Sequence, residues 1–307
     1  MDRDFVNWRG YIPAITTPFT KGFEFDEDAF ARLLDWYIEM GLQGIVVLGT
    51  QGEWFSLARE EKRRLLEIAG AKLDGKMTAI AGCNAFSARE AIENAEMAAD
   101  CNFDGVLLCP PPYIVPTDVE IYSFYKDFCA ASPLPVCIYN WPPGTNVDMK
   151  LPLLSRLADL DKVVALKNST PDLQNFIDVF FGLKDRIRVF GVPMNELGIS
   201  LVVNHDADGL MGAGGVLGAD HPNFFRALWD GDIERARLLG ARDEKYMHDW
   251  FHPDKTGKFG SAQAIFKTAL NLQGLPGGYP RRPILPLEPE GVEIVRATLV
   301  ELGKIEA

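Results

Sequence analysis

Short apolar runs alternate with longer amphipathic stretches along the first two thirds of the chain. Residues 26–40 place apolar side chains three or four positions apart behind aspartates that can cap a helix. The run at 45–48 that follows is uniformly apolar, which is typical of a strand buried on both faces. This unit of strand and helix then repeats along the chain.

The repeat predicts eight strands, each followed by a helix. Alternation of this kind implies parallel pairing with right-handed crossovers. Eight units favour closure into a barrel over an open flavodoxin-like or Rossmann sheet, because no dinucleotide-binding glycine pattern opens the first unit. The predicted fold class is therefore α/β, a (β/α)8 TIM barrel with a C-terminal helical bundle. The expected strands are 12–19, 45–48, 78–81, 105–109, 136–139, 163–167, 187–190 and 209–211, and the expected helices are 26–40, 58–71, 88–99, 118–131, 151–160, 172–183 and 195–203.

Beyond residue 220 the strand pattern stops and only helical periodicity remains. This C-terminal tail contains more helices than the single one that would complete the barrel. We therefore expect a catalytic barrel domain at 1–220 and a C-terminal helical region at 221–307 packed beside it. The helices expected in this tail are 224–228, 233–239, 244–250, 262–272 and 292–302.

Composition narrows the class of protein. With 307 residues, 47% of them hydrophobic and 24% charged, the chain resembles an ordinary globular protein. A net charge of −12 argues against a nucleic-acid surface and against binding to anionic membranes. The 5 cysteines are scattered and none forms a CxxC pair, which favours a reducing compartment. No signal peptide or membrane span is evident, so we expect a cytoplasmic protein.

Lys167 is the first candidate for chemistry, because it ends the apolar run at 163–167. A free lysine has a pKa near ~10.4 and is a poor nucleophile at neutral pH. An apolar wall disfavours the ammonium form and lowers that pKa, and a neutral amine can form a Schiff base. The alternative is a lysine that ends the strand and extends its ammonium into solvent.

The reacting groups of a barrel come from the C-terminal ends of its strands. Tyr139 ends the strand before that of Lys167, and its phenol could relay protons through the hydroxyl of Thr50. The glycines around Thr50 and Gln51 allow a tight loop whose N–H groups could hold a carboxylate. A packing tyrosine and a plain turn are the alternatives. Because no HxxE, HxH or DxD spacing occurs at the strand ends, we expect no metal site and no cofactor.

Four motifs together resemble those of a known family. G-T-Q-G-E at 49–53, P-P-Y at 111–113, Y-N at 139–140 and L-K at 166–167 are similar to motifs of the dihydrodipicolinate synthase/N-acetylneuraminate lyase family of class I, Schiff-base-forming aldolases. The separation of Tyr139 and Lys167 along the sequence also fits the spacing in that family. The resemblance covers the barrel from about 12 to 218, and the tail more loosely.

The resemblance implies roles for several residues. Lys167 would form the Schiff base with the ketone of pyruvate or another 2-oxo acid, and Tyr139 would shuttle protons. Thr50 would link Tyr139 to Tyr113, which in this family commonly reaches in from a neighbouring subunit. The carboxylate of the 2-oxo acid would lie against the backbone amides of Thr50 and Gln51. A homotetramer, built as a dimer of dimers, is implied as well.

Further substrate-binding positions follow, and two of them depart from the family pattern. Met211 matches the position whose backbone carbonyl faces the lysine pocket, and Ser169 could donate to a substrate hydroxyl. Gln51 stands where most members carry a hydroxyl residue. Gly144 stands where dihydrodipicolinate synthases place an arginine for the carboxylate of their aldehyde substrate. The missing arginine weighs against dihydrodipicolinate synthesis.

The expected function is that of a Schiff-base-forming lyase that cleaves or forms a C–C bond between pyruvate and an aldehyde. A dehydratase of a 2-oxo-3-deoxy sugar acid would use the same lysine imine and stays open as the alternative. Dihydrodipicolinate synthase proper and a non-catalytic small-molecule sensor are less expected. A sensor would have no need of Lys167 and Tyr139, and the chain keeps both.

Overall fold

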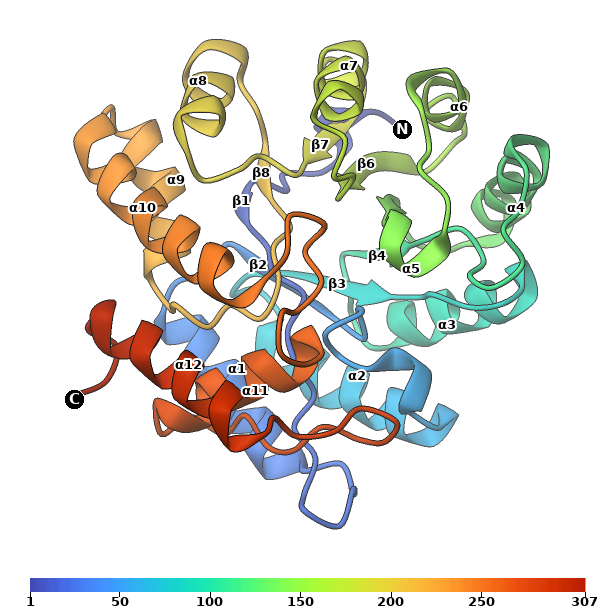
Figure 1. The fold of residues 1–307 in the computed structure, drawn as a ribbon. Coiled ribbons are helices and arrows are strands. Elements are labelled where there is room, and N and C mark those ends of the chain that lie inside the picture. The colour runs from blue at the N-terminus through green and yellow to red at the C-terminus, as the bar shows by residue number, and fades with distance from the viewer. Residues whose placement is uncertain (307) are drawn as a thin grey trace.

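Eight parallel strands form a barrel in the computed structural model, which describes residues 1–306 (Figure 1). The hydrogen-bonded order is β1-β8-β7-β6-β5-β4-β3-β2, and a bridge from Ala14, just after β1, to Val46 of β2 joins its two ends. The predicted (β/α)8 barrel is confirmed. The strands are β1 (Gly10–Tyr11), β2 (Gly44–Val47), β3 (Thr78–Gly82), β4 (Gly105–Leu108), β5 (Val136–Asn140), β6 (Val163–Asn168), β7 (Arg188–Phe190) and β8 (Gly209–Leu210).

The first strand is shorter and lies earlier than the sequence predicts. Only Gly10 and Tyr11 pair continuously with β8, and the expected strand at 12–19 contributes isolated bridges at Ala14 and Phe19. Pro13 and Pro18 lack the N–H group that a continuous ladder needs. The prediction for this element is therefore wrong in its bounds.

Helices follow the strands and form a ring around the barrel (Figure 1). Several begin at a residue whose side chain accepts a hydrogen bond from the first turn, as Asp26, Ser87 and Thr117 do. The helices of this part are α1 (Glu27–Glu39), α2 (Arg59–Leu73), α3 (Ala88–Asp100), α4 (Asp118–Ala131), α5 (Pro142–Thr145), α6 (Leu151–Leu157), α7 (Leu173–Leu183) and α8 (Glu196–His205), with 3-10 turns η1 (Arg3–Phe5) and η2 (Trp54–Ser56).

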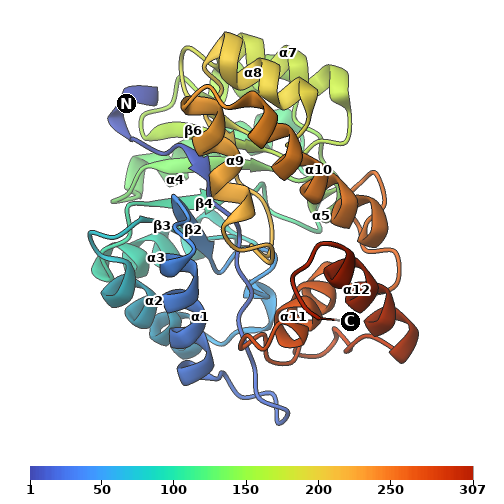
Figure 2. The ribbon, with the colours of Figure 1, turned by 90° about the vertical axis from the view of Figure 1, so that its left-hand side faces the viewer.

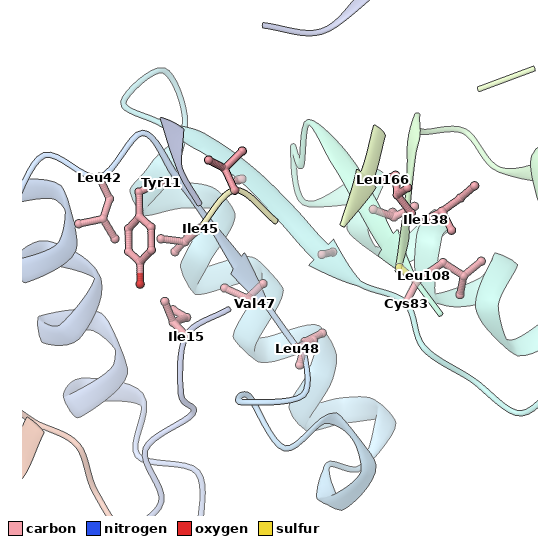
Figure 3. Packing of buried hydrophobic residues seen from close by; sticks show 14 of the residues in the cluster. Tyr11, Ile15, Leu42, Ile45, Val47, Leu48, Cys83, Leu108, Ile138 and Leu166 are labelled. Atoms are coloured by element: carbon pink, nitrogen blue, oxygen red, sulfur yellow. The ribbon is translucent and has the colours of Figure 1, made fainter. Parts of the chain in front are cut away.

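Successive side chains of each strand serve two separate cores. Leu108, Ile138 and Leu166 are register partners on β4, β5 and β6, and they pack together on the outer face, against the helices (Figure 3). The interior of the barrel holds a second cluster that includes Cys137, Ala165 and Met211. This interior layer lies directly beneath the C-terminal ends of the strands, where the candidate chemistry is expected.

The tail consists of α9 (Asp220–Trp229), α10 (Ile233–Trp250), α11 (Ala262–Leu272) and α12 (Pro289–Glu301). Figure 2 shows α11 and α12 beside the barrel. The prediction of two helices at 233–239 and 244–250 is wrong, because α10 passes without a break through Gly240. A Cβ at that position would overlap the carbonyl oxygen of Met194. Gly240 therefore permits a close approach between α10 and the barrel.

The segment between α10 and α11 crosses the mouth of the barrel (Figure 1). It brings residues of the tail next to the strand ends. The division of the chain into domains at residue 220 stays a prediction. Across residues 1–306, no helix combines the length and the apolar character needed to cross a membrane.

Candidate active site

Lys167 lies next to Tyr139 at the C-terminal ends of two neighbouring strands. The two residues are register partners on β6 and β5, and their side chains are only 5% and 4% exposed. The ammonium nitrogen of Lys167 lies 4.4 Å from the centre of the Tyr139 ring. The parallel register of the barrel thus brings together two side chains that the sequence places on separate strands.

The surroundings of Lys167 favour its neutral amine. Burial lowers the pKa of Lys167 to about 7, assisted by the positive charge of Lys255. The Cys137 thiol has its own pKa raised by burial, so it remains protonated at neutral pH. A substantial fraction of Lys167 is therefore available as a nucleophile at neutral pH.

The phenol of Tyr139 lies close to two hydroxyl groups. The side chains of Thr50 and Ser169 act on it by lowering its pKa, and both residues line the same cavity as Lys167. Burial raises the pKa of Tyr139 far above its ordinary value, so this residue is a neutral phenol. A neutral phenol between hydroxyls can pass a proton in one direction while it accepts another.

The loop after β2 turns sharply and is tied to the tail. Glu53 has a φ of 55°, and its buried carboxylate pairs with Lys267 of α11 and accepts from the backbone N–H of Arg281 at 2.9 Å. The amide of Gln263 donates to the carbonyl of Thr50 at 3.0 Å. These contacts fix the loop that carries Thr50 and Gln51.

Two backbone N–H groups in this loop are available to a ligand. Within residues 1–306, neither the N–H of Thr50 nor that of Gln51 donates to a protein acceptor, although Gln51 is only 8% exposed. Buried N–H groups are normally paired. Adjacent unpaired donors beside a buried lysine suit the carboxylate of a 2-oxo acid.

A cavity of about 290 Å³ joins these groups. Predicted site residues Lys167, Tyr139, Thr50, Gln51 and Ser169 all line it, as does Met211, whose sulfur lies 3.7 Å from that of Cys137. The other lining residues are Tyr11, Ala14, Trp141, Gly191, Pro193, Met194, Asn195, Leu210, Gly212, Ala213, Asp243, Glu244, Tyr246, Met247, Phe251, Lys255, Ala262 and Phe266.

Gly144 and Tyr113 do not line this cavity. Gly144 lies in α5 beneath the side chain of Trp141, which stacks on Tyr139 with ring centres 6.2 Å apart. A Cβ at Gly144 would overlap the Trp141 indole. Tyr113 is 90% exposed on the loop before α4. Its predicted role depends on a second subunit and stays a prediction.

Part of the cavity wall comes from the tail, and none of its residues was predicted from the sequence. Asp243, Tyr246 and Phe251 belong to α10 and its C-terminal end, and Lys255 lies in the loop that follows. A search restricted to the C-terminal ends of strands excludes them. Within residues 1–306, no group of three or more His, Cys, Asp and Glu side chains is placed to hold a metal ion.

Comparisons with known proteins agree with this geometry. The family model described as the dihydrodipicolinate synthetase family matches residues 7–302, so the match extends through the helical tail. A relative from Rhizobium meliloti named "Uncharacterized DapA-like lyase" is 30% identical over 284 residues, which cover 92% of this chain and 91% of the relative. A 4-hydroxy-tetrahydrodipicolinate synthase from Oceanobacillus iheyensis is 29% identical, with 96% of this chain and 97% of that protein covered.

Solved dihydrodipicolinate synthase structures have the same fold as this chain. Dihydrodipicolinate synthase from Thermotoga maritima superposes with a TM-score of 0.87 at 26% identity, covering 98% of this chain and 100% of that one. The enzyme from Acinetobacter baumannii, solved in complex with pyruvate, gives a TM-score of 0.86 at 28% identity, with 97% and 99% covered. This chain belongs to the dihydrodipicolinate synthetase family and is an enzyme of the class I aldolase type.

Proposed function

We propose that this enzyme is a Schiff-base-forming lyase that makes or breaks a C–C bond between pyruvate and an aldehyde. The observation that carries the proposal is the buried Lys167 amine, with a pKa lowered to about 7, 4.4 Å from the ring centre of a phenol that has two hydroxyls close to it. Thr50 and Gln51 present unpaired N–H groups to the same cavity.

The first step is attack of the neutral Lys167 amine on the ketone carbon. The N–C bond forms, the ketone oxygen takes a proton to give a carbinolamine, and loss of water leaves a protonated imine. Tyr139 supplies and receives these protons through Thr50 and Ser169. The carboxylate of the 2-oxo acid meanwhile binds the N–H groups of Thr50 and Gln51.

The protonated imine then accepts the electrons of a neighbouring bond. In cleavage, the C4 hydroxyl loses its proton, the C3–C4 bond breaks, and an aldehyde leaves while the pyruvate part becomes an enamine. In synthesis, the same enamine attacks the aldehyde carbon. Protonation of the enamine at C3 and hydrolysis of the imine release pyruvate and restore Lys167.

A dehydratase of a 2-oxo-3-deoxy sugar acid is the second candidate, because it needs the same imine. A base removes a C3 proton, and the C4–O bond breaks as hydroxide leaves and is protonated to water. Ser169 lines the cavity and can donate to a substrate hydroxyl in either reaction. The products differ: the lyase releases pyruvate, and the dehydratase keeps the carbon chain intact.

Dihydrodipicolinate synthesis, the activity that the names of several relatives state, is supported less well. Trp141 occupies the space above Gly144, so an arginine could not be placed there without moving the indole. The cation that those synthases would use for the aldehyde is therefore absent from this side of the cavity.

We also propose that the enzyme is a homo-oligomer, with a homotetramer as the expected form. Tyr113 and Ile114 are 90% and 63% exposed, and Val119 is 71% exposed on the first turn of α4. Tyr113 and Val115 have φ values of 79° and 48°, which are costly for such side chains unless their surroundings enforce them. A neighbouring subunit would both cover and support this loop.

Exchange of the methyl protons of pyruvate with D2O tests the proposal without knowledge of the aldehyde. Enamine formation removes a C3 proton, so proton NMR should show loss of the methyl signal with the wild type and none above background with Lys167→Ala. Lys126→Ala, which changes an exposed lysine of α4, is the control. No exchange by the wild type would contradict the proposal. Pyruvate release from a sugar acid then separates lyase from dehydratase.

A further inference from the structure

The loop between α10 and α11 directs a second lysine into the cavity. A bridge between Phe251 and Gly257 closes the loop, and the N–H of His252 donates to the carbonyl of Thr256 at 2.8 Å. Lys255 is at the tip, with a φ of 67° and its N–H donating to the carbonyl of His252 at 2.8 Å. These contacts hold Lys255 in an uncommon backbone conformation that turns its side chain inward.

The neighbouring residues of this loop are exposed to solvent instead of lining the cavity. His252, Pro253, Asp254 and Thr256 are exposed, and Asp254 accepts from the N–H of Thr256 at 3.0 Å and from its hydroxyl at 2.6 Å. Lys255 is the one charged side chain among residues 251–257 that lines the cavity containing Lys167. The local hydrogen bonds therefore fix the turn without using the ammonium group.

The ammonium group of Lys255 has no partner of its own. Among the hydrogen bonds and ion pairs of residues 1–306, none involves this group. Asp243 is the carboxylate that acts on it, but one oxygen of Asp243 is already 2.9 Å from Nε2 of the buried His221. Burial outweighs the attraction of Asp243 and lowers the pKa of Lys255. The Lys255 side chain is half-buried, and a half-buried cation without a paired anion is stabilised when a ligand anion binds to it.

We propose that Lys255 binds a carboxylate at the end of the substrate remote from the imine. The aldehyde partner of pyruvate, or the corresponding part of a sugar acid, would then be anionic. This inference rests on the proposed function, because Lys167 must hold the other end of the same molecule. Lys255 would thus be the specificity-determining residue of this chain, a contact from the tail that takes the place of the arginine missing at Gly144.

The rest of the cavity supports a singly charged group. Phe251, Phe266, Tyr246 and Met247 surround the Lys255 end and offer mainly apolar surface. Glu244 and Asp243 also line the cavity and would repel additional negative charge. A phosphate dianion normally needs several donors, whereas one lysine can neutralise one carboxylate. On the α5 side the chain has Gly144, covered by Trp141, and therefore no cation. Besides Lys167, the cation of the cavity wall is Lys255, which comes from the tail.

Reductive trapping of matched 2-oxo acids tests this inference without knowledge of the aldehyde. We would treat the full-length enzyme with sodium borohydride and 2-oxoadipate or 2-oxohexanoate, and repeat this with 2-oxoglutarate or 2-oxopentanoate. Each pair has the same chain length and differs in the distal carboxylate. Intact-protein mass spectrometry over a concentration series gives the half-saturating concentration of each acid, and pyruvate serves as the reference.

For the wild type we expect a half-saturating concentration about tenfold lower for the diacid in at least one pair, as a charge-assisted contact would give. Lys255→Met should bring the two members of that pair to the same value, and Lys255→Arg should retain a preference. Lys258→Met, which changes an exposed lysine of the same segment, should keep the wild-type ratio. Because the ratio is taken within one variant, a change in the pKa of Lys167 cancels.

The possible failures are distinguishable. Equal trapping of both members by the wild type would overturn the inference, and so would a preference that survives in Lys255→Met. Trapping of pyruvate but of none of the longer acids would also overturn it, since the cavity would not admit a chain that reaches Lys255. No adduct with any of these acids, pyruvate included, would instead contradict the proposed imine chemistry.

Discussion

The ammonium form of Lys167 is disfavoured because the surrounding wall of the barrel is mainly apolar and because Lys255 shares the cavity. In the proposed mechanism the neutral amine is the reactive form, and its fraction rises as the pH rises through the pKa of about 7. Below that pH the fraction falls about tenfold for each unit. The acid side of a pH profile therefore reports on the surroundings of this one side chain.

We predict that the initial rate of pyruvate trapping by sodium cyanoborohydride rises with a midpoint at pH about 7. Lys255→Met should move the midpoint to higher pH, because it removes a positive charge that lowers the pKa of Lys167. Lys258→Met is the control and should leave the midpoint in place. A midpoint near the ordinary lysine value in the wild type would show that Lys167 is not desolvated.

Tyr139 gives a second prediction at the scale of one residue. Tyr139→Phe removes the hydroxyl that lies close to Thr50 and Ser169, while it leaves the ring that stacks on Trp141. We expect exchange of the pyruvate methyl protons to slow about 10²-fold or more, as the loss of a positioned acid–base group does.

Tyr125→Phe is the matched control for that experiment. The hydroxyl of Tyr125 is also buried, but it donates to the carbonyl of Leu108 at 2.6 Å and does not line the cavity. This variant should lose about 1 kcal/mol of stability and keep its exchange rate. Equal effects of the two substitutions on exchange would argue that Tyr139 acts through packing alone.

Helix α11 acts on the active site through one buried ion pair. Lys267 pairs with Glu53 in the loop after β2, and both side chains are at most 1% exposed. Burial lowers the pKa of Lys267 to about 8, against the raising effect of Glu53. The pair thereby joins the tail to the loop that carries the N–H groups of Thr50 and Gln51.

We predict that Lys267→Met alone destabilises the enzyme by about 3–5 kcal/mol, because it leaves the carboxylate of Glu53 buried without its ion-pair partner. The half-saturating concentration of pyruvate should rise as well, since the loop loses its support. The double variant Glu53→Gln/Lys267→Met should recover part of the stability. Thermal unfolding and reductive trapping measure the two effects, and equal stability of the single variant and the wild type would contradict the prediction.

Local signals explain which elements could be predicted from the sequence. Helix α4 begins at the expected residue because Thr117 and Glu120 form a reciprocal capping box. This motif spans four residues and can therefore be recognised in the sequence. The predicted division of α10 at 240–243 is wrong, and the reason for Gly240 is tertiary: it allows α10 to approach Met194 closely. Sequence reasoning treats a glycine as a break and has no access to that contact.

The residues of the candidate site also fall into two groups: those that a local sequence pattern predicts, and those whose position depends on tertiary packing. Lys167 and Tyr139 could be predicted because each ends an apolar run, and barrel topology then brings strand ends together. Lys255 could not be predicted, because it is a single lysine in a loop between two helices. Its place in the cavity depends on how the tail packs over the barrel and on a left-handed turn that no short motif encodes.

At the scale of the whole molecule, the barrel would supply the proposed imine chemistry, and the tail supplies part of the cavity wall that would surround the second substrate. The proposed oligomer adds a third contribution through the exposed loop at Tyr113. We predict that sedimentation velocity shows an assembly larger than one chain, and that Ile114→Glu shifts it to smaller species and slows exchange. Leu285→Glu is the control, because both side chains are 63% exposed. A monomeric wild type with full activity would contradict this prediction.

The most direct measurement is to locate the adduct that sodium borohydride traps with pyruvate. Peptide mapping by mass spectrometry should find one reduced pyruvate per chain on the peptide that contains Lys167, and Lys167→Ala should carry none. An adduct on Lys255 or Lys267 in the wild type, or one that persists in Lys167→Ala, would contradict the assignment of Lys167 as the imine-forming residue. Absence of any adduct with an active wild-type enzyme would contradict the imine mechanism itself.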